Sequence, residues 1–164
     1  MTILFSEKQR FTQWWIWALL IAVNAVTIYG IVQQIIFKIP FGNNPSPDFA
    51  LLLVSLIPIG IAVLFYTLCL ETEITEQAIR FKFYPLVRSK TIKLEDIHKV
   101  YVRKYAPIRE FGGWGYRVSP NGTAYNVRGN QGLQLELKNG KKILIGTQKP
   151  AELQDLLNNL SIQQ

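Results

Sequence analysis

The sequence is poor in the residues that build metal sites and disulfide frameworks. Its 164 residues include one cysteine, Cys69, and one histidine, His98. A lone cysteine cannot form an intrachain disulfide, and a lone histidine cannot build a histidine-based metal site. Cys69 ends a long apolar run, where we expect a small buried side chain rather than a lipidated one. The sequence therefore predicts no metal and no cofactor.

Catalytic side chains in a recognisable pattern are missing as well. Glu95 and Asp96 are adjacent, but consecutive side chains of a strand point to opposite faces, and we expect residues 95–98 to form a turn between two strands. No spacing identifies a companion for His98 as a catalytic base. The stretch GGWGYRVSPNG, Gly112 to Gly122, lacks the G-x-G-x-x-G pattern followed by a helix that a dinucleotide loop requires. We therefore expect the chain not to be an enzyme.

Charged residues are absent from two long stretches, 14–37 and 49–70. As a helix, the first stretch of about 24 residues would rise roughly 36 Å, enough to cross a hydrocarbon core of about 30 Å. Neither stretch shows the polar stripe of a helix in a soluble protein. The first continues well beyond a possible signal-peptide cleavage site at residues 23–25, which favours an uncleaved anchor. We predict transmembrane helices at 14–37 and 49–70.

The distribution of lysine and arginine predicts how these helices are oriented. Residues 38–48 form a short loop rich in helix breakers, so the two helices make a hairpin and both chain ends lie on one side. That side carries Lys8, Arg10 and a C-terminal region with 15 Lys and Arg against 9 Asp and Glu from Glu71 onward. The positive-inside rule places this side in the cytoplasm. Residues 1–13 are then a cytoplasmic N-terminal segment.

From Glu71 onward the hydrophobic pattern changes to a period of two, as in ETEIT, AIRFKFY and KTIKL, which is typical of half-buried strands. Asn121-Gly122 and Asn139-Gly140 lie between strand-like runs and predict hairpins with type I′ turns. A helix is expected from Pro150, with one apolar stripe made by Leu153, Leu156, Leu157 and Leu160. The predicted fold is α+β: a two-helix transmembrane hairpin, then a mainly-β domain of about seven strands with a C-terminal helix, residues 71–164.

This order resembles the pleckstrin-homology fold, a bent seven-stranded barrel closed by a C-terminal helix. The stretches GGWGYR and AYNVRGNQGLQLELKNGKKILIGTQKP, with the leucine-striped helix, resemble the bacterial pleckstrin-homology-like domains that follow two transmembrane helices in small membrane proteins of unknown function. The resemblance implies a location in the bacterial inner membrane, with both termini cytoplasmic, and names no activity. In lipid-binding eukaryotic relatives, basic residues around the first hairpin loop hold inositol phosphates. We assign that loop to TEQA, Thr75 to Ala78, which is short and acidic, so the phosphoinositide site is not implied.

Cationic and aromatic side chains gather near the glycine-rich stretch and form the candidate binding surface. They are Arg109, Trp114, Tyr116, Arg117, Tyr125, Asn126 and Arg128. Such groups suit lipid headgroups or peptides. The alternative is that the aromatic side chains fill the barrel and the arginines are solvated. In that case Gly113 and Gly115 shape a turn or bulge, and Trp114 is at least partly buried.

Together these patterns favour a non-enzymatic integral membrane protein whose cytoplasmic module binds another membrane protein or itself. Two alternatives stay open: a binder of anionic lipid headgroups through a basic face, and an accessory subunit of a transporter or membrane-bound hydrolase. The two apolar stretches carry no charge that would mark a transport path. No nucleic-acid partner is expected, because the domain is tethered to the bilayer and has no recognition helix.

Overall fold

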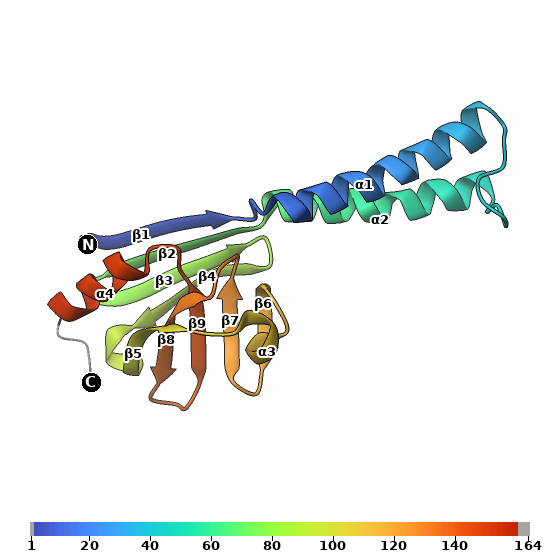
Figure 1. Ribbon diagram of the computed structural model, residues 1–164. Coiled ribbons are helices and arrows are strands. Elements are labelled where there is room, and N and C mark those ends of the chain that lie inside the picture. The colour runs from blue at the N-terminus through green and yellow to red at the C-terminus, as the bar shows by residue number, and fades with distance from the viewer. Residues whose placement is uncertain (1, 161–164) are drawn as a thin grey trace. The chain divides into compact units, whose positions relative to one another are not determined.

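The computed structural model describes residues 2–160 and divides the chain into two compact units. One is Thr12–Thr67, and the other combines Met1–Phe11 with Leu68–Gln164. The helical unit is therefore inserted in the chain between the first and second strands of the β-rich unit (Figure 1). The sequence pattern predicts residues 1–13 to be a segment apart from the domain. In the structure, most of that segment is strand β1, Ile3–Arg10.

The helical unit consists of α1, Trp14–Ile31, extended by a π-helical segment, Val32–Ile36, and of α2, Asp48–Thr67. An amide joins the two helices: Asn24 Nδ2 donates to the carbonyl oxygens of Leu20 at 2.8 Å and Pro58 at 3.3 Å. Pro58 lies inside α2. Asn24 of α1 thus forms a hydrogen bond with α2 within this unit.

The surface of the helical unit is apolar. Both helices are fully described, and their buried residues are limited to Gly30 in α1 and Ser55 in α2. Trp14–Ile36 and Asp48–Thr67 are both strongly apolar along their length. By length and composition, both helices can cross a membrane.

The second helix ends earlier than the predicted boundary at residue 70. Leu68 and Leu70 are buried in the β-rich unit, and Cys69 begins strand β2. A run of apolar residues has the same composition whether it faces lipid or a protein core. The sequence pattern therefore could not separate the end of the helix from the start of the strand.

The first sheet is antiparallel and has the order β1-β2-β3-β4. Its strands after β1 are β2, Cys69–Thr75, β3, Ala78–Tyr84, and β4, Val87–Lys93. Side chains of β3 alternate between buried and exposed, as predicted for AIRFKFY, with Ile79, Phe81 and Phe83 inside. The register places Arg10 opposite Cys69, and Cys69 opposite Tyr84, across three strands.

The second sheet has the order β5-β8-β9-β7-β6. Its strands are β5, Ile97–Lys104, β6, Gly115–Ser119, β7, Gly122–Asn126, β8, Gln131–Leu137, and β9, Lys142–Gly146. Neighbours are antiparallel except for β7 and β9, which are parallel. A short helix, α3, Pro107–Phe111, connects β5 to β6, and the turn expected near Asp96 is a single 3₁₀ turn, Leu94–Asp96.

Both Asn-Gly hairpins are present, but neither has the predicted type I′ turn. That turn needs a positive φ at both central residues, and Lys38 is the one non-glycine with positive φ in the described chain. Between β6 and β7 the loop is Pro120-Asn121, since Ser119 pairs with Gly122, and proline fixes φ near −65°. Between β8 and β9 the Gly140 amide donates to the Leu137 carbonyl at 2.9 Å, and Gly140 has φ 80°. This loop is a longer one that ends in a left-handed glycine.

The core of the β-rich unit lies between the two sheets and under the last helix. The Phe81 ring on β3 lies 4.8 Å from the Tyr125 ring on β7, which joins the two layers. Helix α4, Pro150–Asn159, contacts β5 and β8 in one sheet and β1 in the other. Of the predicted leucine stripe, Leu153 and Leu157 are fully buried, Leu156 is half-buried, and Leu160 is half-buried just beyond the end of the helix.

The fold class is α+β, with two long apolar helices and a β-rich unit of two sheets. The sequence predicted this class. The strand count differs from the prediction of about seven. Eight strands lie between Cys69 and Gly146, and β1 adds one from the N-terminal side of the helices.

Candidate interaction surface

The glycine-rich stretch forms the turn that leads from α3 into β6. Gly113 and Gly115 have φ values of 122° and 113°, a region that side chains with a Cβ rarely adopt. Trp114 between them is partly buried, and its indole Nε1 donates to the Gly129 carbonyl at 2.9 Å. The prediction that these glycines shape a turn around a partly buried tryptophan is confirmed.

Asn126 fixes this turn to the body of the unit. Its Oδ1 accepts from the Gly115 amide at 2.8 Å, and its Nδ2 donates to the Tyr105 hydroxyl oxygen at 2.9 Å. Burial raises the pKa of Tyr105 to about 12, so the phenol stays neutral near pH 7. Asn126 and its neighbour Tyr125 are both buried. These two members of the predicted surface are therefore structural.

The three arginines of the predicted surface are exposed and lie on different elements. Arg109 is on α3 and Arg117 on β6, while Arg128 follows β7. Arg117 Nε donates to the Trp114 carbonyl at 3.1 Å, and Arg128 Nε donates to Gln148 Oε1 at 3.1 Å. Arg117 and Arg128 thus each donate to a nearby uncharged acceptor.

An aromatic row leads from the core to the edge of the second sheet. The Tyr116 ring stacks on Tyr125 with 5.3 Å between centroids, and Tyr125 packs against Phe81. Lys90 Nζ, from β4, donates to the Tyr125 hydroxyl at 3.0 Å. Tyr116 is partly exposed at the end of this row. Of the aromatic residues in the predicted set, Tyr116 and Trp114 are therefore the ones that a partner could reach.

Strand β6 is the edge strand of its sheet, so within residues 2–160 one side of its backbone has no neighbouring strand. Val118 is 71% exposed, and it shares a face of the strand with Tyr116. An exposed edge with apolar side chains is a template for pairing with another strand. We call the residues Gly115–Ser119 the β6 edge.

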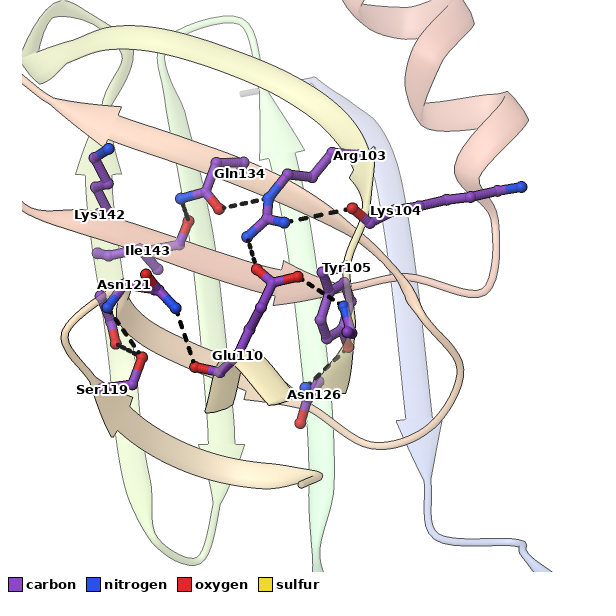
Figure 2. A network of polar contacts seen from close by, with 12 residues as sticks. Arg103, Lys104, Tyr105, Glu110, Ser119, Asn121, Asn126, Gln134, Lys142 and Ile143 are labelled. Carbon is purple, nitrogen blue, oxygen red and sulfur yellow. Dashed lines mark hydrogen bonds and ion pairs between the residues drawn. The ribbon is translucent and has the colours of Figure 1, made fainter. Parts of the chain in front are cut away.

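A polar network, which sequence reasoning missed, lies where α3 covers the second sheet (Figure 2). Arg103 Nη2 and Glu110 Oε2 form an ion pair at 2.8 Å, and Arg103 Nε donates to Gln134 Oε1 at 3.0 Å. Glu110 Oε1 also accepts from the Ala106 amide at 2.7 Å, just before α3 begins. The hydrogen bond from Arg103 lowers the pKa of Glu110 below its usual value.

The same network borders a pocket of about 340 Å³. On its wall the Tyr101 hydroxyl donates to Glu136 Oε1 at 3.1 Å, and Lys142 Nζ lies 3.8 Å from the same oxygen. Burial, and then the hydrogen bond to Glu136, raise the pKa of Tyr101. Both carboxylates of the pocket are thus paired with a cation. The sequence pattern of β5 and β8 does not show that these side chains share a face. That requires the strand register, which places Tyr101 opposite Gln134.

Metal ligands do not gather in the described chain: among residues 2–160, no group of three or more His, Cys, Asp or Glu side chains could hold a metal ion. Comparison of the chain with models of protein families and with curated proteins finds no match. The structure itself defines an α+β chain in which two long apolar helices accompany a β-rich unit of two sheets.

Proposed function

We propose that the chain is a non-enzymatic integral membrane protein whose helical hairpin anchors a pleckstrin-homology-like module for binding to another protein chain. The observation that carries the interaction role is the β6 edge, which combines an unpaired strand backbone with the exposed side chains of Tyr116 and Val118. A partner strand added there would gain main-chain hydrogen bonds, and its side chains would meet the two apolar residues.

The anchoring role is supported by the way the chain enters and leaves the β-rich unit. Arg10, before α1, and Cys69, after α2, are directly opposite each other on neighbouring strands. A hairpin that crosses a bilayer twice returns its two ends to one side, as this register requires. Cleavage of the first helix as a signal peptide would detach β1, although Glu7 and Gln9 of β1 hydrogen-bond to residues 146–148.

Cytoplasmic placement is supported by charge. Lys8 and Arg10 precede the first helix, and the region after the second carries the excess of lysine and arginine noted above. In a bacterial inner membrane, the β-rich unit and both termini then face the cytoplasm.

The pleckstrin-homology-like assignment is supported by strand order. Strands β1 to β4 form one sheet, and β5, β8 and β9 form an antiparallel succession in the other before the C-terminal helix. The β6–β7 hairpin is then an addition to the seven strands of that fold. On this assignment the first strand connection is the helical hairpin rather than Thr75 to Ala78. The loop that holds inositol phosphates in lipid-binding relatives has no counterpart here.

Membrane topology is tested with single cysteines in the full-length protein, with the native Cys69 changed to alanine. A cysteine at Asn44, between the helices, should react with an impermeant maleimide in intact cells, and one at Asn139, in the β8–β9 turn, should react only after lysis. The reverse pattern would overturn the cytoplasmic placement.

The β6 edge is tested with a photoreactive amino acid in native membranes. Benzoylphenylalanine at Val118 should yield a defined crosslinked species, and the same residue at Asn139, in the β8–β9 turn and off the β6 edge, should not. A dimer of the chain indicates self-assembly, whereas a crosslink to a transporter or hydrolase indicates an accessory role. Equal crosslinking at the two positions would refute the β6 edge as the contact surface.

A further inference from the structure

The β3–β4 turn lies at the end of the first sheet where the chain enters and leaves the helical unit. Cys69 opens β2 and pairs with Tyr84, the last residue of β3. Arg10, the last residue of β1, pairs with Cys69 from the other side. Figure 1 shows the β3–β4 turn at the same end of the sheet as the end of β1.

The covalent chain keeps this end close to the helices. Only Leu68 separates the end of α2 at Thr67 from the start of β2 at Cys69. Consecutive Cα atoms are about 3.8 Å apart, so Cys69 lies within about 8 Å of Thr67. Antiparallel partners are about 4.5–5.5 Å apart, which puts the Tyr84 Cα within about 13 Å of Thr67.

Thr67 lies at the membrane boundary if α2 spans the bilayer, as the proposed function requires. The 20 residues of α2 rise about 30 Å, the thickness of the hydrocarbon core. The headgroup layer on each side is about 5–8 Å thick. The β3–β4 turn is therefore held at or beside the headgroup layer by chain length alone.

The side chains of the turn match that environment. Tyr84 is 60% exposed and Leu86 is 52% exposed, and Pro85 between them has no amide hydrogen to satisfy. Tyrosine is enriched at membrane interfaces, where its ring is buried and its hydroxyl is hydrated. At the interface the Leu86 side chain would leave water, which is favourable in proportion to the apolar area removed.

Two arginines border the turn. Arg10 and Arg88 are exposed, and neither forms an ion pair within residues 2–160. By contrast, Lys8 and Lys82, one row further into the sheet, both bind Glu71 at 2.6 Å. Both cations that border the turn are thus available for anionic headgroups.

We propose that the β3–β4 turn, Tyr84 to Arg88, inserts into the headgroup layer of the bilayer that holds the helices, with Tyr84 and Leu86 in the interface and Arg10 and Arg88 on anionic headgroups. This inference rests on the proposed membrane anchoring. The turn then acts as a third contact beside the two chain connections and fixes which end of the sheet faces the lipid.

The test uses full-length protein with Cys69 changed to alanine, reconstituted in nanodiscs of phosphatidylcholine and phosphatidylglycerol that contain spin-labelled lipid. Single cysteines at Leu86, Ile57 and Asn139 carry the fluorophore NBD. The Ile57 label lies inside α2 and reports membrane insertion, and the Asn139 label is the exposed control. We expect the spin label to quench the fluorophore at positions 86 and 57 but not at 139.

Two outcomes separate this inference from the proposed function. Quenching at 57 with none at 86 overturns the contact of the turn and leaves the membrane anchor standing. No quenching at 57 overturns the anchor, and the inference falls with it.

A second measurement tests the arginines. Each cation at an anionic surface changes the binding equilibrium by a factor of about five. In anionic nanodiscs, Arg88→Gln should therefore lower the ratio of inserted to free turn, as reported by quenching at position 86, about fivefold. The control Lys138→Gln, beside the Asn139 turn, should leave it unchanged. Equal quenching at position 86 with and without Arg88→Gln would show that Arg88 makes no headgroup contact.

Discussion

Glu7 is a buried carboxylate that ties the N-terminal strand to the opposite sheet, and its loss is expected to destabilise the β-rich unit strongly. The residue is 6% exposed. Its Oε2 accepts from the Thr147 hydroxyl at 2.7 Å, and its Oε1 accepts from the Gln148 amide at 2.7 Å. Hydrogen bonds to charged groups contribute about 1.5–3 kcal/mol each. We expect Glu7→Ala to lower the free energy of unfolding by about 3–5 kcal/mol, a large share of the roughly 5–15 kcal/mol of a typical domain.

The single cysteine of the chain provides the assay. Cys69 is buried, and its backbone lies opposite Arg10 at the end of β1. The rate at which its thiol is alkylated in increasing urea reports the opening of the first sheet. With a denaturant slope of about 1.5 kcal/mol per molar urea, a loss of 3 kcal/mol moves the midpoint down by about 2 M.

Ser6→Ala is the matched control, because Ser6 is the exposed neighbour of Glu7 on the same strand. Its midpoint should equal that of the wild type. Glu7→Gln should fall between the two, since the amide keeps one acceptor oxygen for one of the two donors. If Glu7→Ala and Ser6→Ala unfold at the same urea concentration, Glu7 does not hold the sheets together.

Three further predictions concern the same unit. Trp114→Ala should cost about 2 kcal/mol in the alkylation assay, because a partly buried indole and its hydrogen bond to Gly129 are lost; intact stability with loss of crosslinking at Val118 would instead make the turn a binding loop. The pKa of Glu110 is lowered in the folded state, so its contribution to stability is present above the unfolded pKa and is lost as pH falls through the folded pKa. The urea midpoint of wild type should therefore fall more steeply than that of Glu110→Gln below about pH 5, and parallel curves would contradict this. A chain that joins residues 2–11 to 68–160 by a short turn should fold without the helices, whereas residues 71–164 alone should not, as judged by circular dichroism and gel filtration.

The strands after Cys69 could be predicted because their inward residues are apolar. In β3, Ile79, Phe81 and Phe83 face the core and charged residues face outward, so the period of two is visible in the sequence. The same holds for the leucine stripe of α4, in which Leu153 and Leu157 are buried. Local pattern and tertiary burial agree in these elements.

Strand β1 could not be predicted in this way. Its inward side chains include Glu7 and Gln9 beside Phe5, so polar residues occupy positions where the pattern requires apolar ones. They are accommodated because Gln9 Nε2 donates to the Gly146 carbonyl at 2.7 Å and Glu7 is bound by Thr147. These partners lie about 140 residues further along the chain, where no local reading of the sequence can find them.

The candidate surface was only partly predictable for a similar reason. Strand β7 lies inside its sheet, between β9 and β6. Tyr125 is covered by Phe81 of the first sheet, and Asn126 is covered by Tyr105 and the glycine turn. Closeness in sequence to exposed Arg128 gave no sign of this burial. The Arg103–Glu110 pair was missed because its members come from different elements, and their meeting depends on where α3 returns over the sheet.

The insertion of the helical hairpin between β1 and β2 makes the helical unit and the β-rich unit depend on each other. Pairing of β1 with β2 closes a loop of residues 11–68, and the entropic cost of such closure grows with the length of a flexible loop. Two packed antiparallel helices are less flexible than an open loop, and contacts such as that of Asn24 with Pro58 reduce this entropic cost. Once the strands have paired, Glu7 and Gln9 join β1 to the end of β9 in the opposite sheet. A change that separates the helices should therefore act on the β-rich unit through β1, in which Phe5 is the one buried apolar side chain.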